Sequence, residues 1–496
     1  MNPNLSERRW AWRGLCIALG GAAALGQAPW GLWWVTLPAF AAVFWLLSHA
    51  QSWRDAAWVG WSAGLGYFAI ALFWIVEPFL VDIARHGWMA PFALLFMAGG
   101  FALFWGAAFG LGHKLGGHGR VAAGVVLLSG AELLRGWILT GFPWAMIGHI
   151  WTDHPVLQSA AVFGAGGLTL LTLTLAALPV LMRRRFAGLV VSVALLAVFW
   201  SYGAYSLRTI VVPETGKFAR VVQPNAPQHL KWDPRYLGQF FTRQLAMTAE
   251  PADAALSLVI WPETAVATLL NEAGLAMEAI SDAAGDVPVI FGINTQVGET
   301  FRNSLALLDG TGALAQTYHK HHLVPFGEYI PLGEALAQLG IRGMAARDGG
   351  GFGAGPGADL LEVDGVGHVL PLICYELIFP RHLRQTERAD LIVQITNDAW
   401  FGNISGPYQH LAQARLRAVE QGIGLVRSAN TGVSAVIDPM GRVTRQIPLN
   451  QTGYMDAAIP GALPPTLYAR TGDGPVTILL LLLLGAVFFA RKRIVD

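Results

Sequence analysis

The sequence predicts a polytopic α-helical membrane domain joined to one α/β domain, and two observations carry that prediction. Of the 496 residues 54% are hydrophobic and only 13% are charged, and the mean hydropathy of +0.46 is unusual for a soluble protein. Acidic residues are rare in 1–210 and 475–490, whereas 215–460 has the mixed composition of a globular domain. The net charge of +1 gives no reason to expect a nucleic-acid partner.

These shifts in composition divide the chain into three parts. We expect a transmembrane domain over 1–210, a globular domain over 211–465, and a last transmembrane helix with a short tail over 466–496. The middle part is long enough to bury a core of its own.

Eight apolar stretches in the outer two parts are each near the length of a membrane-crossing helix. They lie at roughly 11–27, 31–49, 56–80, 88–112, 120–140, 156–182, 186–206 and 475–490. The first resembles a signal peptide because three arginines precede it, but no clear small-residue cleavage site follows. We therefore expect it to be retained.

The basic residues predict the orientation of these crossings. They stand before the first stretch and in alternate connections, at Arg8, Arg9, Arg13, Arg54, Lys114, Arg120, Arg183, Arg184, Arg185, Arg491, Lys492 and Arg493. With eight crossings all of them fall on one side of the membrane, which the positive-inside rule makes cytoplasmic. Both termini are then cytoplasmic, and 207–474 lies on the opposite face, which in a bacterium is the periplasm or the cell exterior.

Two features indicate that the membrane part is more than an anchor. Glu132 and Arg135 lie inside one apolar stretch, where isolated charges are costly. Since they are three residues apart they share a helix face, and both a structural ion pair and a direct contact with substrate stay open. The aromatic segment from Thr140 to Trp151 is expected to face outward as part of an interfacial belt.

From Phe218 onward short β-rich runs replace the long apolar stretches. They are 219–223, 255–260, 287–291, 304–308, 313–318, 369–373, 391–395 and 432–437, with helix-like segments at 235–250, 272–284 and 408–422. Strands that alternate with helices predict a layered α/β domain. Asp309-Gly310 predicts a hairpin, and the glycine-rich run 349–357 a hinge or lid; no Walker lysine makes that run a phosphate site.

Polar residues follow several of these runs directly. Glu263, Lys320, Cys374 and the pair Asn397-Asp398 each come at the end of a strand-like segment. In layered α/β domains strand ends deliver side chains to one edge. A carboxylate that takes a thiol proton, a lysine that stabilises an oxyanion and a cysteine nucleophile form a coherent set. Singly, each has an ordinary alternative: a surface carboxylate, a solvated lysine and a core cysteine.

Three segments resemble the signatures of the nitrilase superfamily, in the same chain order. They are Trp261-Pro-Glu263-Thr-Ala, Tyr318-His-Lys320-His-His-Leu-Val-Pro-Phe-Gly-Glu328 and Ile373-Cys374-Tyr-Glu376. With the apolar stretches and the segments Lys231-Trp232-Asp233, 397–402 and 427–432, the whole chain resembles the apolipoprotein N-acyltransferase family. The resemblance implies an αββα sandwich of the nitrilase type for the α/β domain.

The resemblance also implies roles for individual residues. Cys374 would be the nucleophile, Glu263 the general base, and Lys320 the group that stabilises the oxyanion together with the backbone N–H of Tyr375. Glu328 and Glu376 match positions that support the triad; Glu376 would bind the lysine or orient a lid, and both options stay open. Substrate contacts are implied for Trp232, Asn303 and Trp400, although core packing is an alternative for Trp232.

The implied reaction moves an acyl chain from a phospholipid donor to the N-terminal amine of a diacylglyceryl apolipoprotein, through a thioester on the cysteine. The enzyme would be a monomer in the bacterial inner membrane and would need no cofactor. No metal is expected, because the histidines form no ligand-spaced set beside acidic residues. A membrane-tethered amidase or nitrilase-type hydrolase is the first alternative, and a transporter with an outer domain the second.

Overall fold

The computed structural model of the chain describes residues 3–331 and 351–495. Its backbone clusters into two compact units. The helical unit comprises Met1–Ile210, Ile404–Leu416 and Thr466–Asp496, and the sheet unit comprises Val211–Asn403 and Arg417–Pro465. The first two glycines of the predicted 349–357 loop lie outside the described residues.

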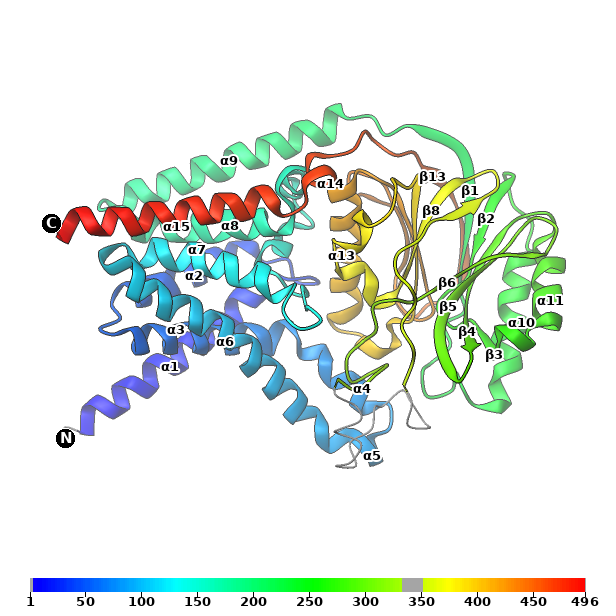
Figure 1. The fold of residues 1–496 in the computed structure, drawn as a ribbon, viewed down its shortest axis with the longest axis horizontal. Coiled ribbons are helices and arrows are strands. Elements are labelled where there is room, and N and C mark those ends of the chain that lie inside the picture. Colours follow the sequence, from blue (N-terminus) through cyan, green and yellow to red (C-terminus); the bar gives the residue numbers. More distant parts are fainter. Residues whose placement is uncertain (1–2, 332–350, 496) are drawn as a thin grey trace. The chain divides into compact units, whose positions relative to one another are not determined.

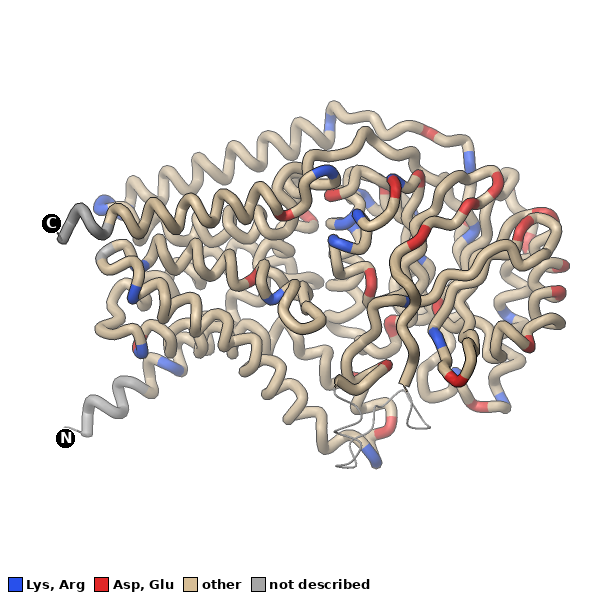
Figure 2. Tube along the Cα trace, viewed as in Figure 1, with Lys and Arg blue, Asp and Glu red and all other residues tan. Residues whose placement is uncertain are grey.

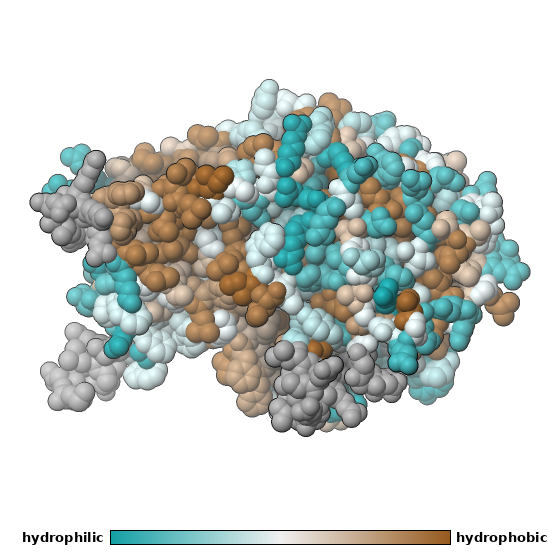
Figure 3. Space-filling model, in the orientation of Figure 1, coloured by the Kyte–Doolittle hydropathy of each residue, from teal (hydrophilic) through white to brown (hydrophobic). Residues whose placement is uncertain are grey.

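The helical unit is an assembly of long apolar helices (Figure 1). Its main helices are α1 (Pro3–Ala24), α2 (Trp33–Ser48), α3 (Trp53–Ala71), α6 (Ala90–Gly116), α7 (Arg120–Arg135), α8 (Ala160–Leu181), α9 (Arg185–Thr209) and α15 (Gly474–Val495). Shorter ones are α4 (Glu77–Leu80), α5 (Ile83–His86) and α14 (Leu467–Thr471). Charged positions are sparse along these helices, and the visible side chains are mostly hydrophobic (Figures 2 and 3).

Each of the eight predicted apolar stretches contains a helix. By length and composition, three helical segments of the described chain can cross a membrane: Ile83–Gly116, Pro155–Leu181 and Arg185–Thr209. A fourth crossing is possible if the bent pair Trp53–Ala71 and Phe73–Leu80 counts as one span. The helices Trp33–Ser48 and Gly474–Ala490 are apolar but shorter.

Three of the predicted stretches differ in shape from one continuous helix, and one of them, 156–182, is kinked at Gly164 of α8. The stretch 56–80 is bent by 64° where α3 ends and the 3-10 turn η1 (Phe73–Val76) begins. The stretch 120–140 is helical only to Arg135, because the chain then turns and the Phe142 N–H bonds to the Arg135 carbonyl at 2.9 Å. The sequence did not predict these bends and ends, since apolar composition does not reveal where a helix bends or ends.

Glu132 and Arg135 form a buried ion pair on α7. The Arg135 guanidinium lies 2.8 Å from the Glu132 carboxylate, and neither side chain is exposed. Arg135 also donates to the carbonyls of Phe142 and Trp144, while the Trp105 indole donates to Glu132 at 2.8 Å. Of the two roles considered for this pair, the contacts are those of structural pairing that holds the 142–144 segment.

The aromatic segment after α7 lies inside the helical unit. Trp144 and Trp151 are both 0% exposed. The Trp144 indole donates to Gln409 at 2.7 Å, and the Trp151 indole to Thr172 at 2.8 Å. The expected outward-facing belt was therefore wrong for these two tryptophans, whose N–H groups find buried acceptors instead.

The sheet unit contains two sheets in the described chain. The first has the strand order β13 (Gly453–Pro460), β1 (Glu214–Gln223), β2 (Leu256–Ile260), β4 (Val289–Val297), β5 (Thr300–Leu308) and β6 (Leu314–His319), with β3 (Val266–Leu269) beside β4. The second has β12 (Val443–Ile447), β11 (Ser434–Ile437), β10 (Leu425–Ala429), β9 (Leu391–Thr396), β8 (Gly367–Ile373) and β7 (Leu361–Val363).

The two sheets pack face to face, as an α/β sandwich requires. Buried hydrogen bonds join them: Ser428 donates to the Val222 carbonyl at 3.0 Å, and Ser434 to Gln223 at 2.6 Å. The pairs β1–β2, β2–β4, β8–β9 and β9–β10 are parallel, while the hairpin predicted at Asp309-Gly310 joins the antiparallel β5 and β6.

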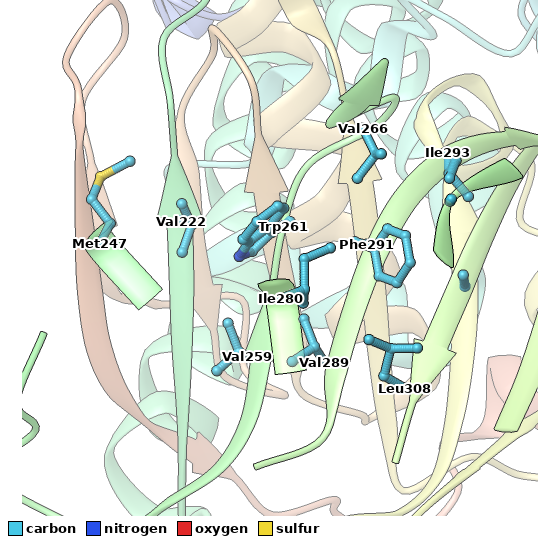
Figure 4. Packing of buried hydrophobic residues seen from close by; sticks show 12 residues of the cluster. Val222, Met247, Val259, Trp261, Val266, Ile280, Val289, Phe291, Ile293 and Leu308 are labelled. Carbon is cyan, nitrogen blue, oxygen red and sulfur yellow. The ribbon is translucent and has the colours of Figure 1, made fainter. Parts of the chain in front are cut away.

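Two helices cover the outer face of the first sheet (Figure 1). They are α10 (Pro234–Ala249) and α11 (Gly274–Ala284), and both match predicted helical segments. Val259, Phe291 and Leu308 from the sheet pack with Met247 of α10 and Ile280 of α11 (Figure 4). This core fixes the strands whose ends carry the polar residues.

Candidate active site

Cys374 occupies a sharp turn at the end of a central strand. β8 is buried from Val369 to Ile373, and the chain then enters the 3-10 turn η7 (Cys374–Ile378). Cys374 has a φ of 52°, a left-handed conformation that side chains other than glycine rarely adopt. Such strain costs about 1–3 kcal/mol and is concentrated at functional sites.

Glu263 lies on a second strained turn, after β2 of the facing sheet. Thr264, the next residue, has a φ of 46°. The turn leans on Gly292 of β4, whose carbonyl accepts the Ala265 N–H at 2.8 Å. A Cβ at position 292 would come within 2.6 Å of the Glu263 Cα, so only glycine permits this approach.

Lys320 follows β6 and points its ammonium at two carboxylates. Its Nζ lies 2.8 Å from Glu328 Oε1 and 4.0 Å from Glu263 Oε1. The side chain is only 1% exposed. Glu328 accepts the Val324 N–H at 2.8 Å, and this bond fixes the position of the carboxylate that pairs with the Lys320 ammonium.

Asn303 joins the two carboxylates from the neighbouring strand β5. Its side-chain Nδ2 donates to Glu263 at 2.7 Å and to Glu328 at 3.3 Å. Its backbone carbonyl accepts the backbone N–H of Lys320 at 2.9 Å. These bonds set the orientation of the amide, so Oδ1 points elsewhere. That buried oxygen has no hydrogen-bond partner among the described residues.

The second oxygen of Glu263 is held from the opposite sheet. The Asn397 N–H, directly after β9, donates to Glu263 Oε2 at 2.8 Å. Cys374 follows the adjacent parallel strand β8. One backbone bond therefore ties the carboxylate from the first sheet to the strand ends of the second.

Burial dominates the electrostatics of these side chains. Burial raises the pKa of Glu263, and the ammonium of Lys320 only partly offsets it. Burial also raises the pKa of the Cys374 thiol, and the Glu263 carboxylate adds to that effect. Burial alone would lower the pKa of Lys320, but Glu328 and Glu263 outweigh it, so the pKa is raised. The site therefore places a thiol beside a carboxyl group whose pKa is raised and a lysine that keeps its proton.

Glu376 binds the backbone of both neighbouring strand ends rather than Lys320. It is 0% exposed and accepts the N–H of Ile373 at 2.8 Å, of His321 at 2.8 Å and of His322 at 3.2 Å. The Tyr318 hydroxyl donates to it at 2.9 Å. Although burial disfavours its charge, these bonds and His321 outweigh that effect and lower the pKa of Glu376.

Three histidines extend this network away from the triad. His321 Nδ1 lies 2.9 Å from Glu376, and its Nε2 lies 3.1 Å from His382 Nδ1. His322 stacks on Phe379, with 3.9 Å between ring centroids. Burial lowers the pKa of His322 to about 3 and that of His382 to about 4, so both are neutral near pH 7.

The sequence prediction missed a polar layer behind Cys374. A side-chain hydrogen bond joins Thr396 to Cys374, and Gln394 donates to the Cys374 carbonyl at 3.1 Å. Arg427, 0% exposed, pairs with both Asp398 and Gln394. The available signal was a charged or amide residue inside an otherwise apolar strand, as at Gln394 and Arg427.

Lys231 was also given no role. Lys231 precedes Trp232 and Asp233 in the sequence, and its Nζ lies 3.0 Å from the backbone carbonyl of Glu263. A lysine beside an aromatic residue in a turn carries no signal of burial by itself.

The other predicted site residues have different environments. Trp232 is 38% exposed, and its ring lies 5.7 Å from the Lys231 ammonium. Trp400 is half-buried in the turn η9 (Asp398–Phe401). The Tyr375 ring is buried against Phe379, with 5.0 Å between centroids.

A cavity of about 640 Å³ lies at the opposite end of β8 from the triad. Its lining includes Gly367 and His368, the first residues of the strand that ends before Cys374. It is therefore separate from the candidate active site. In the ranges that the structure describes, no group of His, Cys, Asp and Glu side chains is placed to hold a metal ion.

Comparison with known proteins gives matches over both parts of the chain. The model of the carbon-nitrogen hydrolase family matches residues 219–463, and that of the apolipoprotein N-acyltransferase N-terminal domain matches residues 19–178. The apolipoprotein N-acyltransferase of Caulobacter vibrioides is 38% identical over 98% of this chain and 96% of its own length. That of Brucella melitensis is 36% identical over 97% of each.

Solved structures match about half of the chain at low similarity. An amidase of the nitrilase superfamily from Nesterenkonia AN1 is 17% identical, covers 54% of this chain and 99% of its own, and has a TM-score of 0.39. A CN-hydrolase superfamily protein from Xanthomonas campestris is 22% identical, covers 53% and 96%, and has a TM-score of 0.37.

Proposed function

The chain belongs to the apolipoprotein N-acyltransferase family, and from this membership we propose the course of its reaction. Cys374 takes an acyl chain from a membrane phospholipid and passes it to the N-terminal α-amine of a diacylglyceryl-cysteine apolipoprotein. The observation that carries this proposal is the convergence of Glu263, Lys320 and Cys374 from strands of two facing sheets.

In the first step Glu263 takes the Cys374 proton and the thiolate attacks the phospholipid ester carbonyl. The raised pKa of Glu263 makes it a stronger base for this transfer. The Lys320 ammonium and the Tyr375 N–H stabilise the tetrahedral oxyanion. When it collapses, the glycerol oxygen leaves with the proton held by Glu263, and the acyl chain stays on sulfur as a thioester.

In the second step the α-amine attacks the thioester and forms an amide. A free α-amine has a pKa of about 7.7–8.0, so a useful fraction is neutral near pH 7. Glu263 accepts the proton that the nitrogen loses, and that proton returns to the departing Cys374 thiolate. The unpartnered Oδ1 of Asn303 is suited to accept an N–H of the amine. Trp232 and Trp400 are proposed to contact the lipid chains.

The proposed location is the bacterial inner membrane, with eight crossings, both termini in the cytoplasm and the sheet unit in the periplasm. Arg54, Lys114, Arg120 and Arg185 lie at helix ends that flank alternate connections of the helical unit, which supports this orientation. We assign 1–210 and 466–496 to the membrane domain and 211–465 to catalysis. The enzyme is proposed to act as a monomer.

The decisive experiment follows the acyl group through both steps. Purified full-length protein is incubated with phospholipid labelled in its acyl chains, and the protein-bound label is tested for release by neutral hydroxylamine. We expect a hydroxylamine-sensitive adduct in the wild-type protein and none in Cys374→Ala. On adding a diacylglyceryl lipopeptide, the label should move to its α-amine as a hydroxylamine-resistant amide.

Cys16→Ala is the matched control, because Cys16 is the other cysteine of the chain and lies in α1. It should retain the adduct. A thioester adduct that persists in Cys374→Ala would refute the assignment of the nucleophile. Release of the label as free fatty acid, with none on the lipopeptide, would favour a hydrolase.

A further inference from the structure

Lys231 is a buried cation next to the proposed general base. Its side chain lies in a turn where the Lys231 N–H bonds to the Pro227 carbonyl at 2.8 Å, and only 7% of the residue is exposed. The ammonium donates to the Glu263 carbonyl at 3.0 Å and to the Thr264 hydroxyl at 2.6 Å. One side chain thus bonds both residues of the turn that presents the base.

That turn needs support from outside its own backbone. Thr264 is β-branched and has a φ of 46°, a conformation that costs of the order of 1–3 kcal/mol and persists only where neighbours enforce it. Gly292 of β4 holds the turn from one side through the Ala265 N–H. The Lys231 ammonium holds the carbonyl and hydroxyl of the same turn, so the direction of the Glu263 side chain depends on it.

The charge of Lys231 also acts on the reacting groups. It interacts electrostatically with both Glu263 and Cys374. Burial lowers its pKa to about 8, although these two acids favour the charged form. Neutral acceptors alone offer little compensation for burying an ammonium, whereas a carboxylate base and a thiol that ionises during the reaction do.

We propose that Lys231 is a positioning residue for acyl transfer, which holds the Glu263–Thr264 turn and favours the ionised forms of Glu263 and Cys374. This rests on the proposed function, in which those two residues are base and nucleophile. Lys231 complements Lys320, whose ammonium faces Glu328 and the oxyanion instead.

The expected effect of removing the charge follows from elementary electrostatics. A nearby cation stabilises a carboxylate and a thiolate, so its loss raises the pKa of both acids. The other charged groups that face them are Lys320, Glu328 and Asp398, and these stay in place. The thiolate fraction at a given pH should then fall, by about tenfold for each unit that the pKa rises.

The test uses three variants of the full-length protein in a Cys16→Ala background. Lys231→Met removes the charge, Lys231→Arg keeps it, and Thr264→Val keeps the charge but removes the hydroxyl contact. The first readout is the rate of Cys374 alkylation by iodoacetamide between pH 7 and 9, which needs no lipid substrate. The second is the rate of the hydroxylamine-sensitive acyl adduct over the same range.

We expect Lys231→Met to alkylate about tenfold more slowly at pH 7, with a deficit that narrows toward pH 9 as Lys231 of the wild type loses its own proton, and to shift its acylation profile to higher pH by about one unit. Lys231→Arg should keep the wild-type profile with a lower maximum, and Thr264→Val should lose rate without a shift. Thermal unfolding of each variant shows whether it is folded.

Two results would overturn the inference. One is wild-type alkylation and acylation in Lys231→Met; the other is a slower Lys231→Met whose pH profile is unmoved, which a merely structural lysine would give. If Lys231→Met does not fold, an alkaline shift in Lys231→Arg equally contradicts the proposal. If alkylation responds as expected but the wild-type protein forms no acyl adduct, the acyl-transfer proposal fails while the role of Lys231 toward the thiol stands.

Discussion

At the scale of single residues, Glu376 decides how the catalytic strand ends meet. Its carboxylate accepts backbone N–H groups from Ile373, which precedes Cys374, and from His321 and His322, which follow Lys320. Hydrogen bonds to a charged acceptor contribute about 1.5–3 kcal/mol each. One buried carboxylate therefore fixes the register of two loops that come from different sheets.

Replacing Glu376 by Gln should separate those loops. The amide keeps one acceptor oxygen but turns an NH₂ toward backbone donors, so we expect a loss of about 2–4 kcal/mol and little activity. Chemical denaturation of the purified protein measures the first, and the acyl adduct the second. Glu362→Gln is the matched control, since that side chain is 82% exposed. Unchanged stability in Glu376→Gln would contradict this account.

Buried histidines near the site should make the fold sensitive to acid. The folded pKa of His322 is about 3 and that of His382 about 4, both lowered first by burial, against about 6.5 in an unfolded chain. Between pH 6.5 and 4 the unfolded chain binds protons that the folded chain refuses. Stability is thus fully present above pH 6.5 and falls as the pH drops, by up to about 1.4 kcal/mol per pH unit for each histidine.

His322→Phe should weaken this dependence. Phenylalanine preserves the stacking on Phe379 and removes a ring whose Nε2 has no hydrogen-bond partner in the described ranges. We expect near wild-type stability at pH 7.5 and a smaller loss of the thermal midpoint between pH 7 and 5. An acid profile that superposes on the wild type would show that His322 is not one of the groups responsible.

At the scale of elements, the buried pair on α7 anchors an irregular segment. Arg135 bonds Glu132 and the carbonyls of Phe142 and Trp144, while Gln27 bonds the Met146 carbonyl at 2.9 Å and Tyr67 the Ala145 carbonyl at 3.1 Å. Backbone carbonyls away from water need such partners. The charged pair therefore serves the loop after α7.

Arg135→Met should be among the most damaging changes in the helical unit. It leaves the Glu132 carboxylate buried without its cation, which typically costs about 3–5 kcal/mol. The double change Glu132→Gln with Arg135→Met should recover part of the thermal midpoint in detergent. Arg208→Met, at an exposed position of α9, is the control. Equal midpoints for wild type and Arg135→Met would mean that the pair contributes nothing.

At the scale of the whole molecule, the proposed topology is open to accessibility labelling. A cysteine at Glu272, an exposed position before α11, should react with a membrane-impermeant maleimide once the outer membrane is permeabilised. Arg184→Cys, in the connection before α9, should react only after the inner membrane is broken. Both are made in a Cys16→Ala background. Labelling of position 272 only after lysis would reverse the orientation.

Most of the helices and strands could be predicted because they depend on local amino-acid composition. Every predicted strand run overlaps an observed strand, since buried strands are short apolar runs. The prediction omitted β3, β7, β10, β12 and β13. β10 contains Arg427 and Ser428, whose side chains bond to Gln394 of β9 and to the Val222 carbonyl of β1. These partners are distant in the chain, so the local sequence does not predict that the polar residues are buried in a strand.

The residues of the candidate triad were predicted from strand ends and motifs, but the contacts between them were not. That Lys320 pairs with Glu328, that Glu376 binds backbone, and that Asn397 holds Glu263 depend on contacts between segments distant in the chain. The same holds for Trp144 and Trp151, whose composition favoured an interface while their indoles found buried acceptors. The sequence by itself determined that an apolar helical part adjoins an α/β part, because this follows from hydropathy and periodicity, and its short motifs predicted the candidate reacting residues. Only the tertiary structure decided which buried charges meet, because burial and pairing are properties of the packed chain.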